Sequence, residues 1–170
     1  MQIYESQGYT QREAAQSILE NNLFGLDIDK RAAQLAYFAV MMKAREYDRR
    51  FLTRGISPHV YSITESSNID DFTLDYFING DKELSEQINA IISAFKDAKE
   101  FGSIIQFKDI KFEQINARLD EISEDFNIAR ELVLEELLPI VRVAEILASK
   151  YAVVATNPPY LNRMNNKLKS

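Results

Sequence analysis

Residues 21–46, with the sequence NNLFGLDIDKRAAQLAYFAVMMKARE, contain a strand and a helix in immediate succession. Residues 23–28 are apolar apart from Asp27, which is typical of a short buried strand. Asp29 is a good N-cap residue and predicts a long helix over residues 30–52. Apolar side chains cover much of the surface of this helix, so we expect it to pack on a sheet rather than to lie loosely outside.

The segments on either side continue the alternation of helix and strand. Upstream, residues 3–19 have an amphipathic helical pattern that contains a capping box at Thr10 and Glu13. Gly8 lies within this segment, so a second interpretation is two helices separated at Gly8. Downstream, residues 58–64 (PHVYSIT) alternate and are rich in β-branched and aromatic residues, which predicts a second strand. Strands separated by helices indicate a parallel sheet.

A long helical block follows the second strand. Helices are predicted at residues 69–79 and 81–101. Residues 112–137 place apolar side chains at alternating intervals of three and four, so we expect one long helix that packs on another helix. We call this line of apolar side chains the apolar seam, and we expect it to pack within the molecule against the helix at residues 81–101. The alternative is that the seam forms a helical self-association module. Pro139 is expected to kink or end the helix before a further helix at residues 140–149.

A third strand is predicted at residues 151–156, where an apolar run ends at a proline-rich corner. The order of elements indicates an α/β fold that is predominantly helical, with a small parallel sheet and a large helical insertion. We divide the chain into a first part at residues 1–68, the helical insertion at residues 69–150, and a final strand with its corner and basic tail at residues 151–170.

Composition and charge exclude several classes of function. The 170 residues are 46% hydrophobic and 27% charged, and the net charge of −6 argues against strong nucleic-acid binding by this chain alone. The absence of cysteine excludes disulfides, thiol catalysis and cysteine-based zinc sites. His59 is the only histidine, so we expect it to be structural or exposed and expect no metal site. No apolar run approaches the roughly 20 residues that span a bilayer, and a cytoplasmic protein without membrane contact is expected.

The corner at residues 156–160, TNPPY, follows directly on a predicted strand. Ligands of open parallel sheets bind at the carboxyl ends of strands. Pro158 and Pro159 fix the backbone, so the side-chain oxygen of Asn157 and a backbone carbonyl become two rigidly held acceptors. They fit a planar amino group with two N–H donors. Accepting a hydrogen bond from each N–H draws electron density onto the nitrogen and prepares it as a nucleophile. Tyr160 offers a flat face for stacking of a base.

This corner resembles the catalytic motif of S-adenosylmethionine-dependent amino-methyltransferases, above all the adenine-N6 DNA methyltransferases. The resemblance implies a partial Rossmann-like class I methyltransferase fold. It also implies direct transfer of a methyl group from S-adenosylmethionine to the N6 amino group of an adenine that is flipped out of double-stranded DNA. The residues that it places at the target amine are Asn157, Pro158, Pro159 and Tyr160.

The stretch at residues 21–46 resembles the second-strand region of the same enzymes. There an acidic residue at the strand end accepts hydrogen bonds from the ribose hydroxyls of the cofactor, and the apolar residue beside it packs on the adenine. By position these are Asp27 and Ile28. An acid at the end of the next strand binds the adenine amino group, and this role falls to Glu65. The sequence FGLDIDKRAAQLAYFAVMMKARE, followed after a long insert by TNPPYLN, is similar to sequences of the BREX (PglX-like) and type IIG methyltransferases of restriction and phage defence.

The sequence departs from these enzymes at Ala152, where they commonly carry an aspartate, and in its cofactor-binding region. They carry a glycine-rich cofactor turn before the second strand, and no such turn occurs in these 170 residues. We therefore expect an internal fragment that transfers no methyl group by itself. The strand edges next to the absent central strand are expected to pair, either by a shift of residues 151–156 beside residues 23–28 or with a second copy. The alternative enzymes are methyltransferases of protein glutamine or of an RNA base, because these targets also present a planar amino group.

Overall fold

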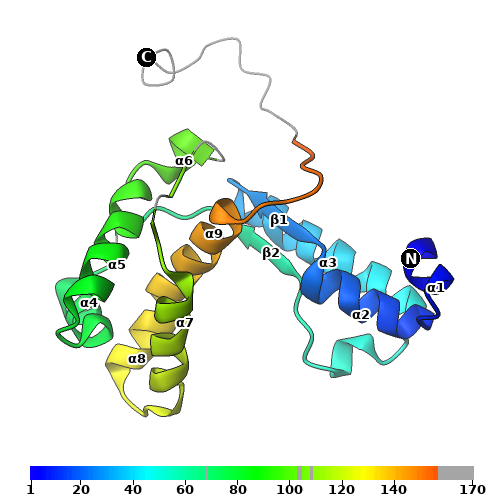
Figure 1. The fold of residues 1–170 in the computed structure, drawn as a ribbon, viewed down its shortest axis with the longest axis horizontal. Coiled ribbons are helices and arrows are strands. Elements are labelled where there is room, and N and C mark those ends of the chain that lie inside the picture. The colour runs from blue at the N-terminus through cyan, green and yellow to red at the C-terminus, as the bar shows by residue number, and fades with distance from the viewer. Residues whose placement is uncertain (68, 103–104, 108, 157–170) are drawn as a thin grey trace, which may run out of the picture.

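The computed structural model describes residues 1–67, 69–102, 105–107 and 109–156, which form an elongated, mostly helical molecule (Figure 1). No helix in these ranges is long and apolar enough to cross a membrane. The strands are β1 Phe24–Asp27 and β2 His59–Ser62. Shorter turns are the 3-10 helices Phe51–Thr53 and Ile122–Glu124 and the π-helical turn Val133–Leu137. The α-helices are α1 Gln2–Ser6, α2 Gln11–Asn21, α3 Lys30–Tyr47, α4 Asp71–Ile78, α5 Lys82–Ala94, α6 Ala98–Phe101, α7 Phe112–Glu121, α8 Ile128–Leu132 and α9 Leu138–Ala148.

The two strands form a parallel sheet near the middle of the molecule (Figure 1). Their register runs from Phe24 opposite His59 to Asp27 opposite Ser62. The N–H of Ile63 donates to the carbonyl oxygen of Asp27 at 2.8 Å and extends the ladder beyond the last pair. The prediction of a small parallel sheet in a predominantly helical chain is confirmed.

Helices pack on both faces of this sheet. Leu26 and Tyr61 pack against the main hydrophobic core, to which α9 contributes. Side chains alternate along a strand, so Val60 faces the opposite side, and α3 packs there. The expectation that the long helix packs on the sheet is confirmed, although α3 ends at Tyr47 because Asp48 adopts an extended backbone.

The N-terminal helices pack against α3 through a smaller core. The segment is divided at Gly8, whose φ of 89° lies in the left-handed region that favours glycine. The capping box is present: Thr10 accepts from the backbone N–H of Glu13, whose carboxylate accepts from the N–H of Thr10. The small core consists of Leu19, Ala44 and Phe51, with further apolar side chains around them.

The main core lies within the helical block and reaches the sheet. Its side chains come from α4, α5, α7 and α9 and from the turns between α7 and α9, and Ile63 joins it from just beyond β2. Ile88, Ile91 and Ile115 are fully buried in it. The apolar seam of residues 112–137 therefore packs within the molecule, as predicted: it shares one core with α5, and α8 packs against α4.

The single long helix predicted over residues 112–137 is wrong. The chain is extended at Asp125, and Asn127 begins a new helix by accepting from the backbone N–H of Arg130. Phe126, the one seam residue at this break, is fully exposed. The reversal lets α7 and α8 both pack against the core, which a straight helix cannot do. The helix predicted at residues 81–101 is likewise divided, between α5 and α6.

Pro139 lies in the first turn of α9 rather than at the end of a helix. The π-helical turn Val133–Leu137 directly precedes it, so helical backbone continues from α8 into α9. Proline lacks an N–H and crowds the carbonyl four residues before it, here that of Glu135, which lies in the widened turn. The helix predicted at residues 140–149 is thereby confirmed with an earlier start.

The third strand predicted at residues 151–156 is also wrong. These residues make no strand pairing, and Val153 and Val154 are 84% and 71% exposed. A strand needs a partner for its N–H and C=O groups, and β1 pairs only with β2 among the described residues. Residues 151–156 therefore do not occupy the free edge of β1, which corrects the expected shift of this segment beside the first strand.

Candidate active site

The carboxyl ends of β1 and β2 bring the three predicted cofactor residues to one edge of the sheet. Asp27 ends β1, and Ile28 follows it. Glu65 follows the last residue of β2, Ser62, by three positions. Because Ile63 donates to the carbonyl of Asp27, the two chain segments still lie side by side at this edge. Ligands of open parallel sheets bind at such an edge.

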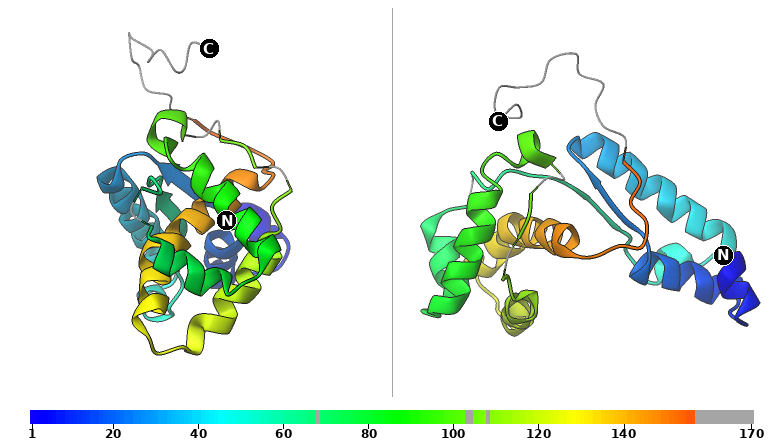
Figure 2. Two further views of the ribbon diagram at one scale, coloured as in Figure 1. Left: turned by 90° about the vertical axis from the view of Figure 1, so that its left-hand side faces the viewer. Right: turned by 45° about the horizontal axis from the view of Figure 1, so that its top comes forward.

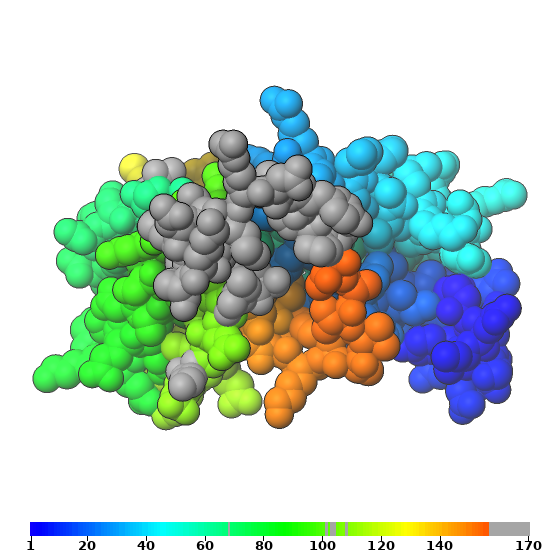
Figure 3. All heavy atoms as spheres, turned by 90° about the horizontal axis from the view of Figure 1, so that it is seen from above, coloured from blue at the N-terminus to red at the C-terminus, as the bar shows by residue number. Residues whose placement is uncertain are grey.

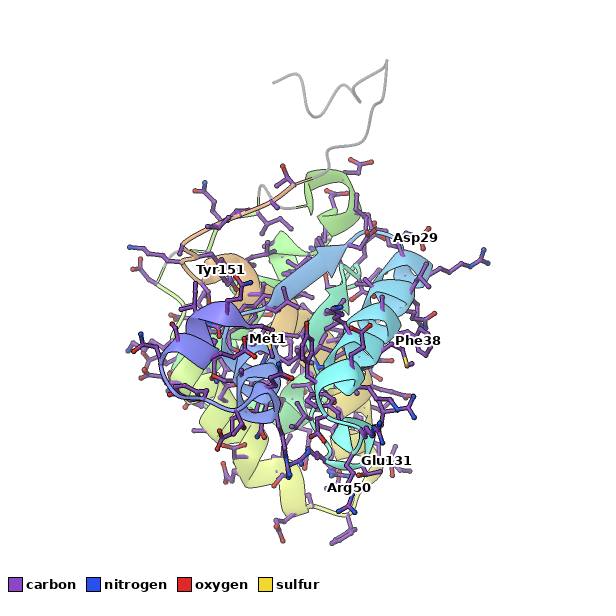
Figure 4. The ribbon with its side chains drawn as sticks, turned by 90° about the vertical axis from the view of Figure 1, so that its right-hand side faces the viewer. Met1, Asp29, Phe38, Arg50, Glu131 and Tyr151 are labelled. Atoms are coloured by element: carbon purple, nitrogen blue, oxygen red, sulfur yellow. The ribbon has the colours of Figure 1, made fainter. Side chains whose placement is uncertain are left out.

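The turn after β1 holds the carboxylate of Asp27 in place. Its Oδ1 accepts from the backbone N–H of Asp29 at 2.8 Å. Asp29 in turn accepts from the N–H groups of Arg31 and Ala32 at 2.7 and 3.3 Å and so caps α3. Figure 4 places Asp29 at the start of this helix, next to the end of β1. Asp27 itself stays exposed to solvent, so its carboxylate is both oriented and accessible.

Ile28 presents an apolar side chain beside that carboxylate. It is 44% exposed, whereas the earlier strand residues Phe24, Gly25 and Leu26 are half-buried. An exposed carboxylate next to an exposed apolar side chain suits a ligand that has both hydroxyl groups and a flat ring.

Glu65 lies in a segment that is tied to the helical block. It is partly buried, and the next residue, Ser66, is only 5% exposed. The hydroxyl of Ser66 donates to the carbonyl of Ile92 at 2.7 Å, and its N–H donates to the carbonyl of Phe95 at 3.2 Å. The position of Glu65 at the sheet edge therefore depends on α5. The sequence gave no signal for this role of Ser66, because a serine in a polar loop does not predict a buried contact with a distant helix.

The predicted catalytic residues Asn157, Pro158, Pro159 and Tyr160 lie outside the described residues. The chain that leads to them starts at Tyr151, whose ring lies 5.3 Å from that of Phe24 at the beginning of β1. Residues 152–156 then run toward the carboxyl end of the sheet (Figure 2). Seen from above, this segment lies between the helical block and the N-terminal helices (Figure 3).

An aromatic group at the amino end of the sheet was not predicted. Phe24 stacks on His59 with ring centroids 4.9 Å apart, and Nε2 of His59 lies 3.0 Å from the carbonyl oxygen of Glu20. His59 is thus structural, as predicted. Burial raises the pKa of Tyr151, which joins this group, and also that of Tyr61. Only the pairing of strands distant in sequence brings these rings together.

Two surface hollows of the described chain lie away from this edge. One, of about 500 Å³, is lined in part by Arg54 and His59, and another, of about 520 Å³, lies around Lys111. Neither includes Asp27 or Ile28. In the described ranges, no three histidine, aspartate or glutamate side chains gather to hold a metal ion. Asp27 and Ile28 are exposed at the carboxyl end of the sheet and line neither of these hollows.

Comparison with known proteins identifies the class of protein to which this edge belongs. The family model described as Eco57I restriction-modification methylase matches residues 21–170. This match begins just before β1 and includes both strands and the Asn-Pro-Pro-Tyr corner. The chain therefore belongs to the Eco57I restriction-modification methylase family.

Two relatives place the chain within this class. The adenine-specific methyltransferase PglX of Lacticaseibacillus casei (strain Zhang) is 38% identical over 168 residues, which cover 95% of this chain and 14% of the relative. The adenine-specific methyltransferase BrxX of Escherichia coli O9:H4 (strain HS) is 37% identical over 193 residues, which cover 98% of this chain and 16% of the relative. The predicted kinship with PglX-like methyltransferases is confirmed, and the chain spans about one seventh of the length of these relatives.

Proposed function

We propose that this chain forms part of an adenine-specific DNA methyltransferase of restriction-modification or phage defence, acting in the cytoplasm. In this proposal it supplies the ribose-binding edge and the catalytic corner of a Rossmann-like domain, with residues 69–150 as a helical insertion. The observation that carries the proposal is the exposed, oriented carboxylate of Asp27 at the carboxyl end of a parallel strand. The names of the relatives support adenine rather than glutamine as the target, and the restriction-modification family supports DNA rather than RNA.

The cofactor proposed for this edge is S-adenosylmethionine, which supplies a methyl group on a sulfonium. Asp27 has two carboxylate oxygens for the cis-diol of a ribose, and the bonds are charge-assisted. Ile28 supplies apolar contact for an adenine ring, and Glu65 accepts from its amino group. The exposure of Asp27 and Ile28 at one edge supports these roles.

The target proposed for the corner is the N6 amino group of an adenine flipped out of double-stranded DNA. The side-chain oxygen of Asn157 and the backbone carbonyl of Pro158 accept hydrogen bonds from the two N–H groups of the amine. Pro159 stiffens the corner, and Tyr160 stacks on the base. These groups orient the amine and raise the electron density on its nitrogen. Residues 151–156 lead the chain from the beginning of β1 toward the edge that carries Asp27, which agrees with this assignment (Figure 2).

We expect no methyl transfer from the 170-residue chain alone, because its sequence has no glycine-rich cofactor turn. The proposal is therefore tested on the product of the full open reading frame. Methylation of DNA is measured with radiolabelled S-adenosylmethionine, and cofactor affinity is measured by calorimetry. Nucleoside analysis of the product identifies N6-methyladenine.

Asn157→Ala is expected to abolish methylation and to leave cofactor affinity unchanged, since Asn157 contacts the target amine. The matched control is Asn89→Ala, an exposed asparagine on α5. Loss of cofactor affinity in Asn157→Ala would contradict the assignment of this residue. A methylated protein or RNA in place of DNA would replace the proposed substrate with one of the alternatives.

A further inference from the structure

The reversal between α7 and α8 displays two large apolar side chains to solvent. Phe126 is fully exposed and Ile128 is 72% exposed, although both come from a segment whose other apolar residues are mostly buried. Residues 120–136 carry seven acidic side chains and a single basic one, Arg130. We call residues 125–128 the acidic knob.

The acidic knob is held by hydrogen bonds from the rest of the helical block. The hydroxyl of Tyr76 donates to Asp125 and accepts from the side-chain amide of Asn127. Arg130 donates to the carbonyl of Ser123 at 3.0 Å, which closes the turn from the other side. Phe126 is thus held outward by a well-bonded turn, and its exposure is not the result of a loose loop.

A second apolar surface lies on α3, on the side away from the sheet. Leu35 and Phe38 are 69% and 61% exposed, and Met42 is 36% exposed. Their spacing of three and four residues places them in one line along the helix. Figure 4 shows Phe38 on the outer side of α3. We call these three residues the α3 row.

The surroundings of the α3 row have the charge opposite to that of the knob. Arg31 and Arg45 lie three or four residues from members of the row and are exposed, so they border it, and Glu46 borders it in the same way. Glu46 is paired with Lys43, so Arg31 and Arg45 leave the border of the row basic. An apolar row with a basic border complements an apolar knob with an acidic border.

We propose that the acidic knob of one copy of this chain docks on the α3 row of a second copy. The two surfaces cannot meet within one chain, because α3 and α8 lie in different halves of the molecule (Figure 1). The acidic border makes a nucleic acid an unsuitable partner for the knob. The contact joins two different surfaces, so each copy keeps one free knob and one free row, and association is open-ended.

The expected association is weak and depends on salt. The apolar contact area is small, and interfaces below about 1,200 Å² are typical of transient complexes. Opposite charges around the contact are screened at high ionic strength, with a Debye length of about 3 Å at 1 M. Pairing between free strand edges, the other route to self-association, depends on backbone hydrogen bonds and needs neither surface.

The test is sedimentation equilibrium of the 170-residue chain over a wide concentration range, at low and high salt. We expect the average mass to rise above the monomer mass of 19.6 kDa with concentration at low salt, and to fall at high salt. Phe126→Ser and Phe38→Ser are each expected to raise the dissociation constant at least tenfold. The matched control is Ile3→Ser, which removes an apolar side chain that is 80% exposed outside both surfaces.

A mixing experiment distinguishes this contact from any symmetric one. Phe126→Ser keeps an intact row and Phe38→Ser keeps an intact knob, so an equimolar mixture is expected to form dimers and nothing larger. Circular dichroism checks that each variant is folded. A wild-type chain that stays monomeric at all concentrations overturns the proposal. So does association that both variants retain, or a mixture that remains monomeric.

Discussion

At the scale of single residues, the turn after β1 combines a structural role with a binding role. Asp29 uses its carboxylate to cap α3, while Asp27 accepts one N–H and stays exposed. Two acidic residues only two positions apart thus have different environments. The strand pairing decides which of them lies at the end of β1, and only that one is placed to bind a ligand of the sheet edge.

Replacement of Asp27 by alanine is expected to weaken binding of S-adenosylmethionine. The loss of charge-assisted hydrogen bonds to the ribose costs about 1.5–3 kcal/mol, or roughly 10- to 150-fold in the dissociation constant. Calorimetry on the product of the full open reading frame measures this change. Asp120→Ala, at an exposed position of α7, serves as the control. An unchanged dissociation constant in Asp27→Ala would remove Asp27 from the site.

Replacement of Asp29 by alanine is expected to lower stability. The change removes the acceptor for the backbone N–H groups of Arg31 and Ala32 and costs about 0.5–2 kcal/mol of unfolding free energy. Urea denaturation followed by circular dichroism measures it. Asp29→Asn retains a capping oxygen and is expected to restore most of the loss. Equal stability of the alanine variant and the wild type would contradict the capping role.

At the scale of elements, the helical block is held together by apolar contacts between helices that are distant in sequence. The fully buried residues Ile88 and Ile91 of α5 share one core with Ile115 of α7. Polar contacts support this packing at its border. Gln87 donates to the side chain of Gln114 at 2.8 Å and accepts from the N–H of Lys111 at 2.7 Å. Both interactions fix α7 against α5.

Truncation of Ile115 to alanine is expected to destabilise the chain by about 2–5 kcal/mol, because a cavity remains in a packed core. Ile115 is fully buried, whereas Ile128 is 72% exposed. Ile128→Ala therefore serves as the control, with an expected change of less than about 0.5 kcal/mol. Urea denaturation measures both. A similar effect of the two substitutions would show that the core is placed wrongly.

At the scale of the whole molecule, the two hydrophobic cores differ greatly in size. The main core includes side chains of the sheet, of the segment after β2 and of the helical block. The small core unites Leu19, Ala44 and Phe51 between α2, α3 and the turn that follows α3. α3 also packs on the sheet and so connects the two regions. The N-terminal helices therefore depend on fewer buried contacts than the rest.

Hydrogen exchange is expected to reveal this difference. Amides of α5, next to the main core, should exchange only on global unfolding, whereas those of α2 should exchange through a local opening of lower free energy. Mass spectrometry of peptides from the two helices, with exchange measured at increasing urea, separates these cases. Equal protection of α2 and α5 would indicate that the two cores unfold together.

The sequence by itself determined the local features of this protein. The strand at β1, the cap at Asp29 and the capping box of α2 follow from patterns within a few residues of each other, and the parallel sheet follows from the alternation of strands and helices. The kinship with PglX-like methyltransferases also followed from short motifs, since the family match covers the stretches that carry them. The roles of Asp27, Ile28 and Glu65, and of the corner at Asn157, stay predictions.

Only the tertiary structure decided which apolar segments are buried and which are left in solvent. The regular seam predicted one long helix, but two helices that fold back bury most of that seam in the main core and leave Phe126 outside. Residues 151–156 have the composition of a strand, yet a strand exists only where a neighbour accepts its hydrogen bonds. Such outcomes depend on contacts between distant segments, and local periodicity carries no information about them.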